Sequence, residues 1–116
     1  MAEWLNAIAI KDLKDGQMAE VTVTGRSILV ARVGDKFYAA NNTCPHMGGN
    51  LSQGTLEETI VTCPNHGSRF DLTDGRIVRW TTWKGLTRLF GNLISSPKPL
   101  KVYKTRVVEG QLQISI

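Results

Sequence analysis

Apolar and polar residues alternate in short runs along much of the chain, as they do in strands with one buried face. From Ala19 to Thr24 every second residue is apolar, and the residues between them are Glu or Thr. The last residues follow the same pattern, with Leu112, Ile114 and Ile116 separated by polar side chains. This pattern predicts an all-β chain whose strands form a sandwich or a barrel.

Turn-forming pairs separate these runs. Gly34-Asp35 lies between two apolar runs and suits a tight hairpin turn, and Glu109-Gly110 precedes the last run. Repeats, low-complexity tracts and linkers are absent from the sequence, and 116 residues are enough for one domain with a modest core. We therefore expect a single domain over residues 1–116.

All four soft metal ligands of the chain lie in two short segments, Cys44-Pro45-His46 and Cys63-Pro64-Asn65-His66. Each segment offers one thiolate and one imidazole. A Cys2His2 zinc finger instead pairs Cys with Cys and His with His along the chain. In a cluster of two irons and two sulfides, one iron can take both thiolates and the other both imidazoles. The order of the ligands therefore favours a two-iron site.

Two simpler interpretations of these residues remain open. A disulfide between Cys44 and Cys63 would leave the matched spacing of His46 and His66 unexplained, and it suits a secreted chain better. A single zinc ion would accept these four ligands, although their order is not the usual one for zinc.

The two segments, separated by sixteen residues, resemble the signature of Rieske proteins. The resemblance implies one [2Fe-2S] cluster per chain. Cys44 and Cys63 would bind its inner iron, and His46 and His66 its outer, solvent-facing iron. It also implies the Rieske fold, an antiparallel β-sandwich with a smaller cluster-binding subdomain made of the two ligand loops, here at about residues 41–72.

Further residues around the ligands match positions of that family. By resemblance, the Ser68 hydroxyl bonds a bridging sulfide, and Met47 adds an apolar shield next to a ligand. Pro97 and Pro99 resemble the proline loop that packs over the cluster and keeps water away from it, and proline fixes the backbone there without leaving a donor unpaired. The competing interpretation of the two prolines is a simple loop before a strand at Leu100.

High-potential members of the family carry an extra Cys in each ligand loop and a Tyr hydroxyl that bonds a cysteine sulfur. Gly49, Asn65 and Phe70 stand at the matching positions here. Since a disulfide and one hydrogen-bond donor are missing, we expect a reduction potential in the lower part of the Rieske range, nearer about −150 mV than +300 mV.

The resemblance implies a one-electron carrier, not an enzyme, that passes electrons from a flavin-dependent reductase to a terminal oxidoreductase such as a ring-hydroxylating oxygenase. The His46 and His66 edges would be the exit point. Two alternatives stay open: the small subunit of a larger reductase complex such as nitrite reductase, and a binding module whose cluster is structural or acts as a sensor. Because the first residues show no basic segment followed by an apolar run, we expect a cytoplasmic protein.

A stretch at about residues 79–96 does not fit the resemblance. Its large apolar residues recur at three- and four-residue steps, which predicts one face of a helix. They are Trp80, Trp83, Leu86, Phe90 and Leu93 or Ile94.

Charged residues are unevenly distributed along the chain. The segment between Gly75 and Val108 has eight basic residues and no acidic one, whereas residues 1–74 have six basic and nine acidic.

Three interpretations of this basic insert follow. It can be a short helix that covers part of the core, with its charges solvated. It can be a docking surface for an acidic redox partner, because an apolar patch surrounded by charge of one sign provides both steering and contact. It can also attach to an anionic membrane surface. We expect no nucleic acid partner, because no recognition motif accompanies the basic residues.

Overall fold

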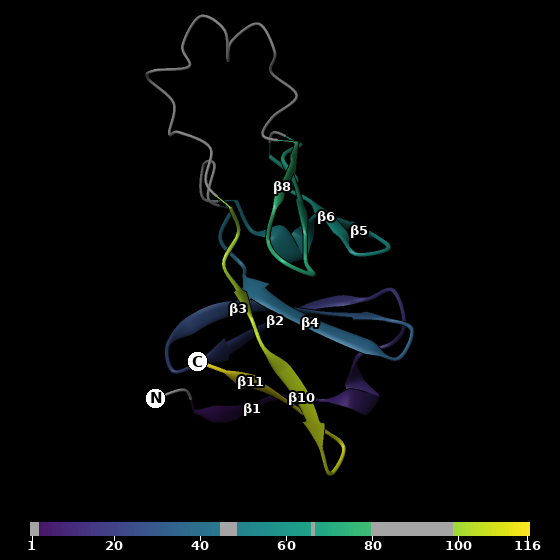
Figure 1. Ribbon diagram of the computed structural model, residues 1–116, viewed down its shortest axis with the longest axis vertical. Helices are drawn as coiled ribbons and strands as arrows, with labels where there is room; N and C mark the ends of the chain where they lie inside the picture. The colour runs from purple at the N-terminus through teal and green to yellow at the C-terminus, as the bar shows by residue number, and fades with distance from the viewer. Residues whose placement is uncertain (1–2, 45–48, 66, 80–98) are drawn as a thin grey trace, which may run out of the picture.

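The computed structural model of the chain describes residues 3–44, 49–65, 67–79 and 99–116 (Figure 1). Its regular elements are strands, apart from two short 3-10 helices, η1 (Ile10–Asp12) and η2 (Leu51–Gln53). The strands are β1 (Trp4–Ala9), β2 (Met18–Val23), β3 (Arg26–Val33), β4 (Lys36–Asn41), β5 (Thr55–Glu57), β6 (Ile60–Thr62), β7 (Arg69–Asp71), β8 (Ile77–Arg79), β9 (Val102–Tyr103), β10 (Thr105–Val108) and β11 (Gln111–Ser115).

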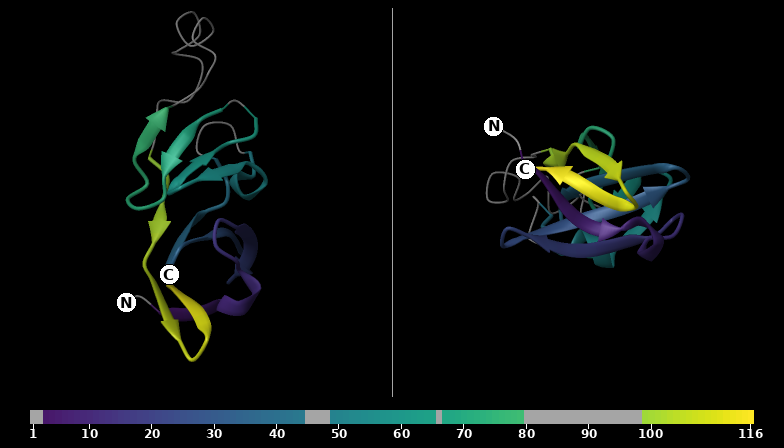
Figure 2. Two further views of the ribbon diagram at one scale, coloured as in Figure 1. Left: turned by 90° about the vertical axis from the view of Figure 1, so that its right-hand side faces the viewer. Right: turned by 90° about the horizontal axis from the view of Figure 1, so that it is seen from below.

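These strands form three antiparallel sheets, ordered β1-β11-β10, β2-β3-β4-β9 and β5-β6-β7-β8. Figure 1 shows the first sheet at the lower end, the second across the middle and the third at the upper end, and the side view in Figure 2 shows the same order. The predicted all-β, antiparallel fold is confirmed.

Strand β3 separates two cores, because both of its faces are buried. Ile28 and Val30 face a cluster closed by the β1-β11-β10 sheet, which we call the sandwich core. Leu29 and Ala31 face a second cluster that includes residues of the upper sheet, which we call the ligand-loop core. A strand buried on both faces has no alternation of apolar and polar residues. This explains the unbroken apolar run that follows Ser27.

Strand β1 has no clear signal in the sequence, and its register explains why. A shift between Asn6 and Ile8 in its pairing with β11 inserts an extra residue. Ala7 and Ile8, which are neighbours in the chain, consequently both pack against the sandwich core. A bulge of this kind breaks the two-residue period that sequence analysis relies on.

The expected turns are present at both predicted hairpins. Gly34 adopts a φ of 63° between β3 and β4, and Glu109 and Gly110 adopt φ values of 50° and 76° between β10 and β11. The predicted helix over residues 79–96 lies outside the described residues, except for Arg79, which belongs to β8 instead. In the part of the chain that the structure describes, no helix is long and apolar enough to cross a membrane.

Candidate metal centre

The first ligand loop, between β4 and β5, is held by the side chain of Asn42, which is fully buried. Its Nδ2 donates to Glu20 Oε2 at 3.1 Å and to Ser27 Oγ at 3.0 Å, and its Oδ1 accepts from the Ser52 N–H at 2.8 Å. The Asn42 carbonyl also accepts from the Leu51 N–H at 2.8 Å. Both ends of the loop are thereby tied to the β2–β3 hairpin.

Sequence analysis did not identify Asn42. The only signal available was an Asn two residues before a ligand, at the end of an apolar strand. Its role depends on Ser27 and Glu20, which are distant in the sequence. The Ser27 hydroxyl itself donates to Glu20 Oε2, so all three side chains belong to one network.

The second ligand loop connects β6 to β7 and is a tight turn. The Cys63 N–H donates to the Ser68 carbonyl at 2.8 Å, and the Gly67 N–H donates to the Cys63 carbonyl at 3.2 Å. Gly67 has a φ of 74°, a backbone conformation that glycine adopts without a steric penalty. The hydrogen bonds of this turn therefore fix the backbone at Cys63 and Gly67.

Arg79 on β8 holds the same turn from outside. Its Nε donates to the Gly67 carbonyl at 3.1 Å. The pairing of β7 with β8 shifts between Arg69↔Arg79 and Phe70↔Ile77, so Val78 is an extra residue in the ladder. Bulges of this kind redirect neighbouring side chains. Sequence analysis missed this contact, because it depends on the register shift.

The two cysteines lie together in the ligand-loop core and are 2% and 3% exposed. The structure joins them by no disulfide, which contradicts the disulfide interpretation. The two loops meet at Gly49, where a Cβ atom would lie 3.0 Å from Cys63 Sγ and 2.7 Å from Asn65 Nδ2. Gly49 and Asn65, which stand where high-potential relatives have their extra cysteines, thus face each other across the two loops.

Ser68 is also completely buried, and its hydroxyl has no hydrogen-bond partner among the described residues. A buried polar group left unpaired costs about 1–3 kcal/mol, so it calls for an acceptor that the described residues do not supply. A sulfide or thiolate of a cluster is such an acceptor. Together with two buried thiols, the unpaired hydroxyl fits an iron–sulfur cluster.

Four of the predicted site residues, His46, Met47, His66 and Pro97, lie outside the described residues. Of the predicted proline pair, Pro99 is described and is exposed. The next residue, Leu100, is 3% exposed and packs in the ligand-loop core with both cysteines. The Leu100 N–H donates to the Gly75 carbonyl at 2.8 Å, so this segment is anchored beside the site.

A second anchor of that segment is the turn from Asp71 to Arg76. Burial raises the pKa of Asp71, but hydrogen bonds from the Thr73 N–H and hydroxyl, a hydrogen bond from Thr59 and the charge of Arg76 outweigh it and hold the pKa below its ordinary value. The Arg76 guanidinium lies 3.1 Å from Asp71 Oδ2. A Cβ at Gly75 would lie 1.9 Å from the Leu100 carbonyl oxygen, so only glycine fits there.

Known proteins share both the sequence and the fold of this chain. Residues 3–104 match the Rieske [2Fe-2S] domain. Ferredoxin CarAc of Metapseudomonas resinovorans is 34% identical over 115 residues, which are 97% of this chain and 92% of that protein. The ferredoxin component of the naphthalene 1,2-dioxygenase system of Pseudomonas putida is 35% identical over 74 residues, or 64% of this chain and 71% of that protein.

A solved structure extends the likeness to three dimensions. It is the complex of reduced oxygenase and oxidized ferredoxin in carbazole 1,9a-dioxygenase. A chain of that complex aligns with a TM-score of 0.76 at 33% identity, covering 97% of this chain and 92% of the other.

Proposed function

Because the chain belongs to the Rieske [2Fe-2S] domain family, we propose that it is the ferredoxin component of a ring-hydroxylating oxygenase system. It binds one [2Fe-2S] cluster and carries single electrons between protein partners. In the proposed system the donor is a flavin-dependent reductase, and the acceptor is the terminal oxygenase. The likeness to ferredoxin CarAc over nearly the whole chain carries this proposal, and it favours a ferredoxin over a nitrite reductase subunit or a sensor.

The proposed ligands are Cys44 and Cys63 for one iron and His46 and His66 for the other. Support comes from the two buried thiols and from the contact of the two loops at Gly49. A cluster at this place gains or loses one electron at a time. With two thiolates and two neutral imidazoles the ligands bring two negative charges fewer than four thiolates, which favours the reduced state.

The residues around the thiols set the local environment. The fully buried side chains of Phe70 and Leu51 pack in the same core as the cysteines and keep water away from them. The unpaired Ser68 hydroxyl is placed to donate to a sulfur, which stabilises added negative charge by about 1.5–3 kcal/mol. We propose that Met47, Pro97 and Pro99 complete this shield.

The proposed potential lies in the lower part of the Rieske range. Cysteine is absent from positions 49 and 65, so the disulfide of the high-potential members cannot form between the loops. Phe70 has no hydroxyl to donate to a cysteine sulfur. Both features remove stabilisation of the reduced state that high-potential members have.

We further propose a single domain over residues 1–116 in the cytoplasm. The β2-β3-β4-β9 sheet contributes to both cores, which supports one folding unit. A cluster with thiolate ligands needs cysteines that are not joined in a disulfide, and a reducing compartment such as the cytoplasm keeps them so.

A direct electron-transfer assay tests the proposed function. The reduced protein is mixed in a stopped-flow instrument with the oxidised oxygenase of a carbazole 1,9a-dioxygenase system, and the loss of the reduced spectrum is followed. We expect reoxidation that is second order overall and substrate turnover when a reductase and NADH are added. Reduction of a nitrite reductase without any transfer to ring-hydroxylating oxygenases would contradict the proposal.

A further inference from the structure

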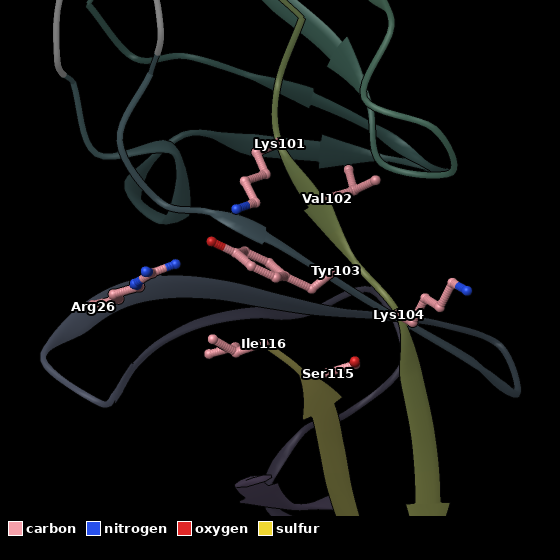
Figure 3. A pocket seen from close by; sticks show the side chains of 7 residues that line it. All are labelled: Arg26, Lys101, Val102, Tyr103, Lys104, Ser115 and Ile116. Atoms are coloured by element: carbon pink, nitrogen blue, oxygen red, sulfur yellow. The ribbon is translucent and has the colours of Figure 1, made fainter. Parts of the chain in front are cut away.

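Two adjoining pockets lie beside the first ligand loop, on the side where β9 returns to the sandwich. One, of about 340 Å³, is lined by Arg26, Ser27, Asn41, Thr43, Lys101 and Tyr103. The other, of about 280 Å³, shares Arg26, Lys101 and Tyr103 and extends toward Ile116 (Figure 3). We call the two together the Tyr103 cleft. Thr43, which lines the first pocket, directly precedes Cys44 in the first ligand loop.

Two cationic side chains converge in the Tyr103 cleft. Figure 3 shows Arg26 and Lys101 pointing toward the Tyr103 hydroxyl from two different segments of the chain, while Lys104 extends away from them. Lys101 Nζ lies 5.3 Å from the centre of the Tyr103 ring. Aspartate and glutamate do not occur among the described residues that line either pocket.

Neither Arg26 nor Lys101 forms an ion pair within the described part of the chain. The ion pairs found there join Arg69 to Glu57 and Arg76 to Asp71. The one carboxylate bonded at the edge of the cleft, that of Glu20, accepts hydrogen bonds from Ser27 and Asn42. Arg26 and Lys101 therefore form no ion pair with the described residues.

The backbone fixes the positions from which these side chains extend. Arg26 follows a two-residue turn in which Thr24 and Gly25 have φ values of 51° and 77°, the conformation of a tight hairpin turn. The Asn41 N–H donates to the Lys101 carbonyl at 2.9 Å. The Tyr103 hydroxyl donates to Asn41 Oδ1 at 2.5 Å, which leaves the amide Nδ2 of Asn41 to donate to a ligand. A site that is ordered in advance binds at a lower entropic cost.

We propose that the Tyr103 cleft binds the carboxylates of an acidic segment on the oxygenase. The inference rests on the proposed function and adds the place and chemistry of docking. A guanidinium, an ammonium and an amide N–H₂ together form a donor set suited to a carboxylate. Because Thr43 in the wall of the cleft directly precedes Cys44, a partner seated in the cleft also lies beside the segment that leads into the first ligand loop. Charge complementarity at such a place raises the association rate and orients the partner.

A matched pair of variants tests the proposal. Arg26→Gln with Lys101→Gln removes both charges of the cleft. Lys36→Gln combined with Lys11→Gln removes two exposed charges elsewhere, with Lys36 at the opposite end of the β3–β4 hairpin from Arg26. The protein with its cluster is titrated with an octaglutamate peptide and, separately, with inorganic phosphate, and amide shifts are recorded by NMR. Electron transfer to the oxygenase is measured as a function of salt.

We expect the peptide to shift the amides of Arg26, Asn41 and Lys101. In the cleft variant the affinity for the peptide should fall by about tenfold. Electron transfer at low salt should slow to a similar degree. The control variant should change either quantity by no more than about twofold. The reduction potential and the EPR spectrum should not change in the cleft variant, which separates a loss of docking from a loss of the cluster.

Three results would overturn the proposal. Equal losses in the cleft and control variants would indicate a general charge effect. Equal shifts with phosphate and with the peptide would indicate a small-anion site. Unchanged electron transfer in the cleft variant would place the oxygenase elsewhere, while the carrier function would still stand. A wild-type protein that transfers no electron to any such oxygenase would instead contradict the proposed function.

Discussion

The two cores on either side of β3 differ in their buried polar groups. The sandwich core consists of apolar and aromatic side chains, such as Ile28 and Leu112, closed by strands that pair over most of their length. The ligand-loop core contains both cysteines, and the loops that lead into it carry the buried polar side chains of Asn42 and Ser68. Hydrophobic burial thus builds one region, whereas the other also needs specific hydrogen bonds. Changes in the two regions should have separable effects.

The largest effect is expected where the two ligand loops touch. Gly49→Val places its Cβ 3.0 Å from Cys63 Sγ and 2.7 Å from Asn65 Nδ2, so the two loops must move apart. We expect less than half of the wild-type iron content per chain, with the sandwich still folded by circular dichroism. Gly110→Asn is the control, since that glycine has a φ of 76° and open space around it and Asn tolerates this conformation. Full iron content in the Gly49→Val variant would show that the loops do not meet there.

The next prediction compares the stability effects of one substitution in each of the two regions. Ile28→Ala removes fully buried methylene groups from the sandwich core and should lower the free energy of unfolding by about 2–5 kcal/mol, with no change in reduction potential. Asn42→Ala should lower the free energy of unfolding by about 1–3 kcal/mol, because it removes the hydrogen bonds that a fully buried side chain makes to Glu20, Ser27 and Ser52. It should also speed loss of the cluster. Chemical denaturation and the decay of visible absorbance measure the two quantities. Equal rates of cluster loss in both variants would contradict the separation of the two regions.

A smaller effect concerns the potential alone. Ser68→Ala removes the unpaired hydroxyl and should lower the reduction potential by tens of millivolts to about 100 mV, since about 59 mV corresponds to 1.4 kcal/mol for one electron. Phe70→Tyr should raise it if the new hydroxyl reaches a cysteine sulfur. Protein-film voltammetry measures both. An unchanged potential in the Ser68→Ala variant would mean that the hydroxyl does not donate to the cluster.

The smallest effect belongs to the turn that anchors Leu100. Since the folded-state pKa of Asp71 lies below its ordinary value, its carboxylate stabilises the fold above about pH 4, and this contribution disappears as the pH falls through the lowered pKa. Asp71→Asn should therefore cost about 1 kcal/mol near pH 7, and less under acid conditions. Unfolding kinetics after a pH jump measure the difference. A difference that grows as the pH falls would contradict this assignment.

The features predicted correctly from the sequence are those that depend only on residues close together in the chain. The alternation at β2, the turn at Gly34 and the Cys and His spacing each need only neighbouring residues, and the family assignment follows from that spacing. Strand β1 was missed because its bulge breaks the two-residue period.

The supports of the site were missed for a related reason. Asn42 acts through Glu20 and Ser27, which are distant in the sequence and are brought together only when the hairpin docks. Arg79 reaches Gly67 only because of the register shift in β8. The interpretation of the basic insert at residues 79–96 stays a prediction.

Pulsed EPR of the reduced protein labelled with ¹⁵N-histidine tests the central claim most directly. The chain has two histidines, so the label reports only on His46 and His66. We predict two ¹⁵N nuclei strongly coupled to the unpaired electron, in a protein with about two irons and two sulfides per chain. A reduced cluster with no coupled ¹⁵N, or one zinc per chain in place of iron, would contradict a Rieske centre at this site.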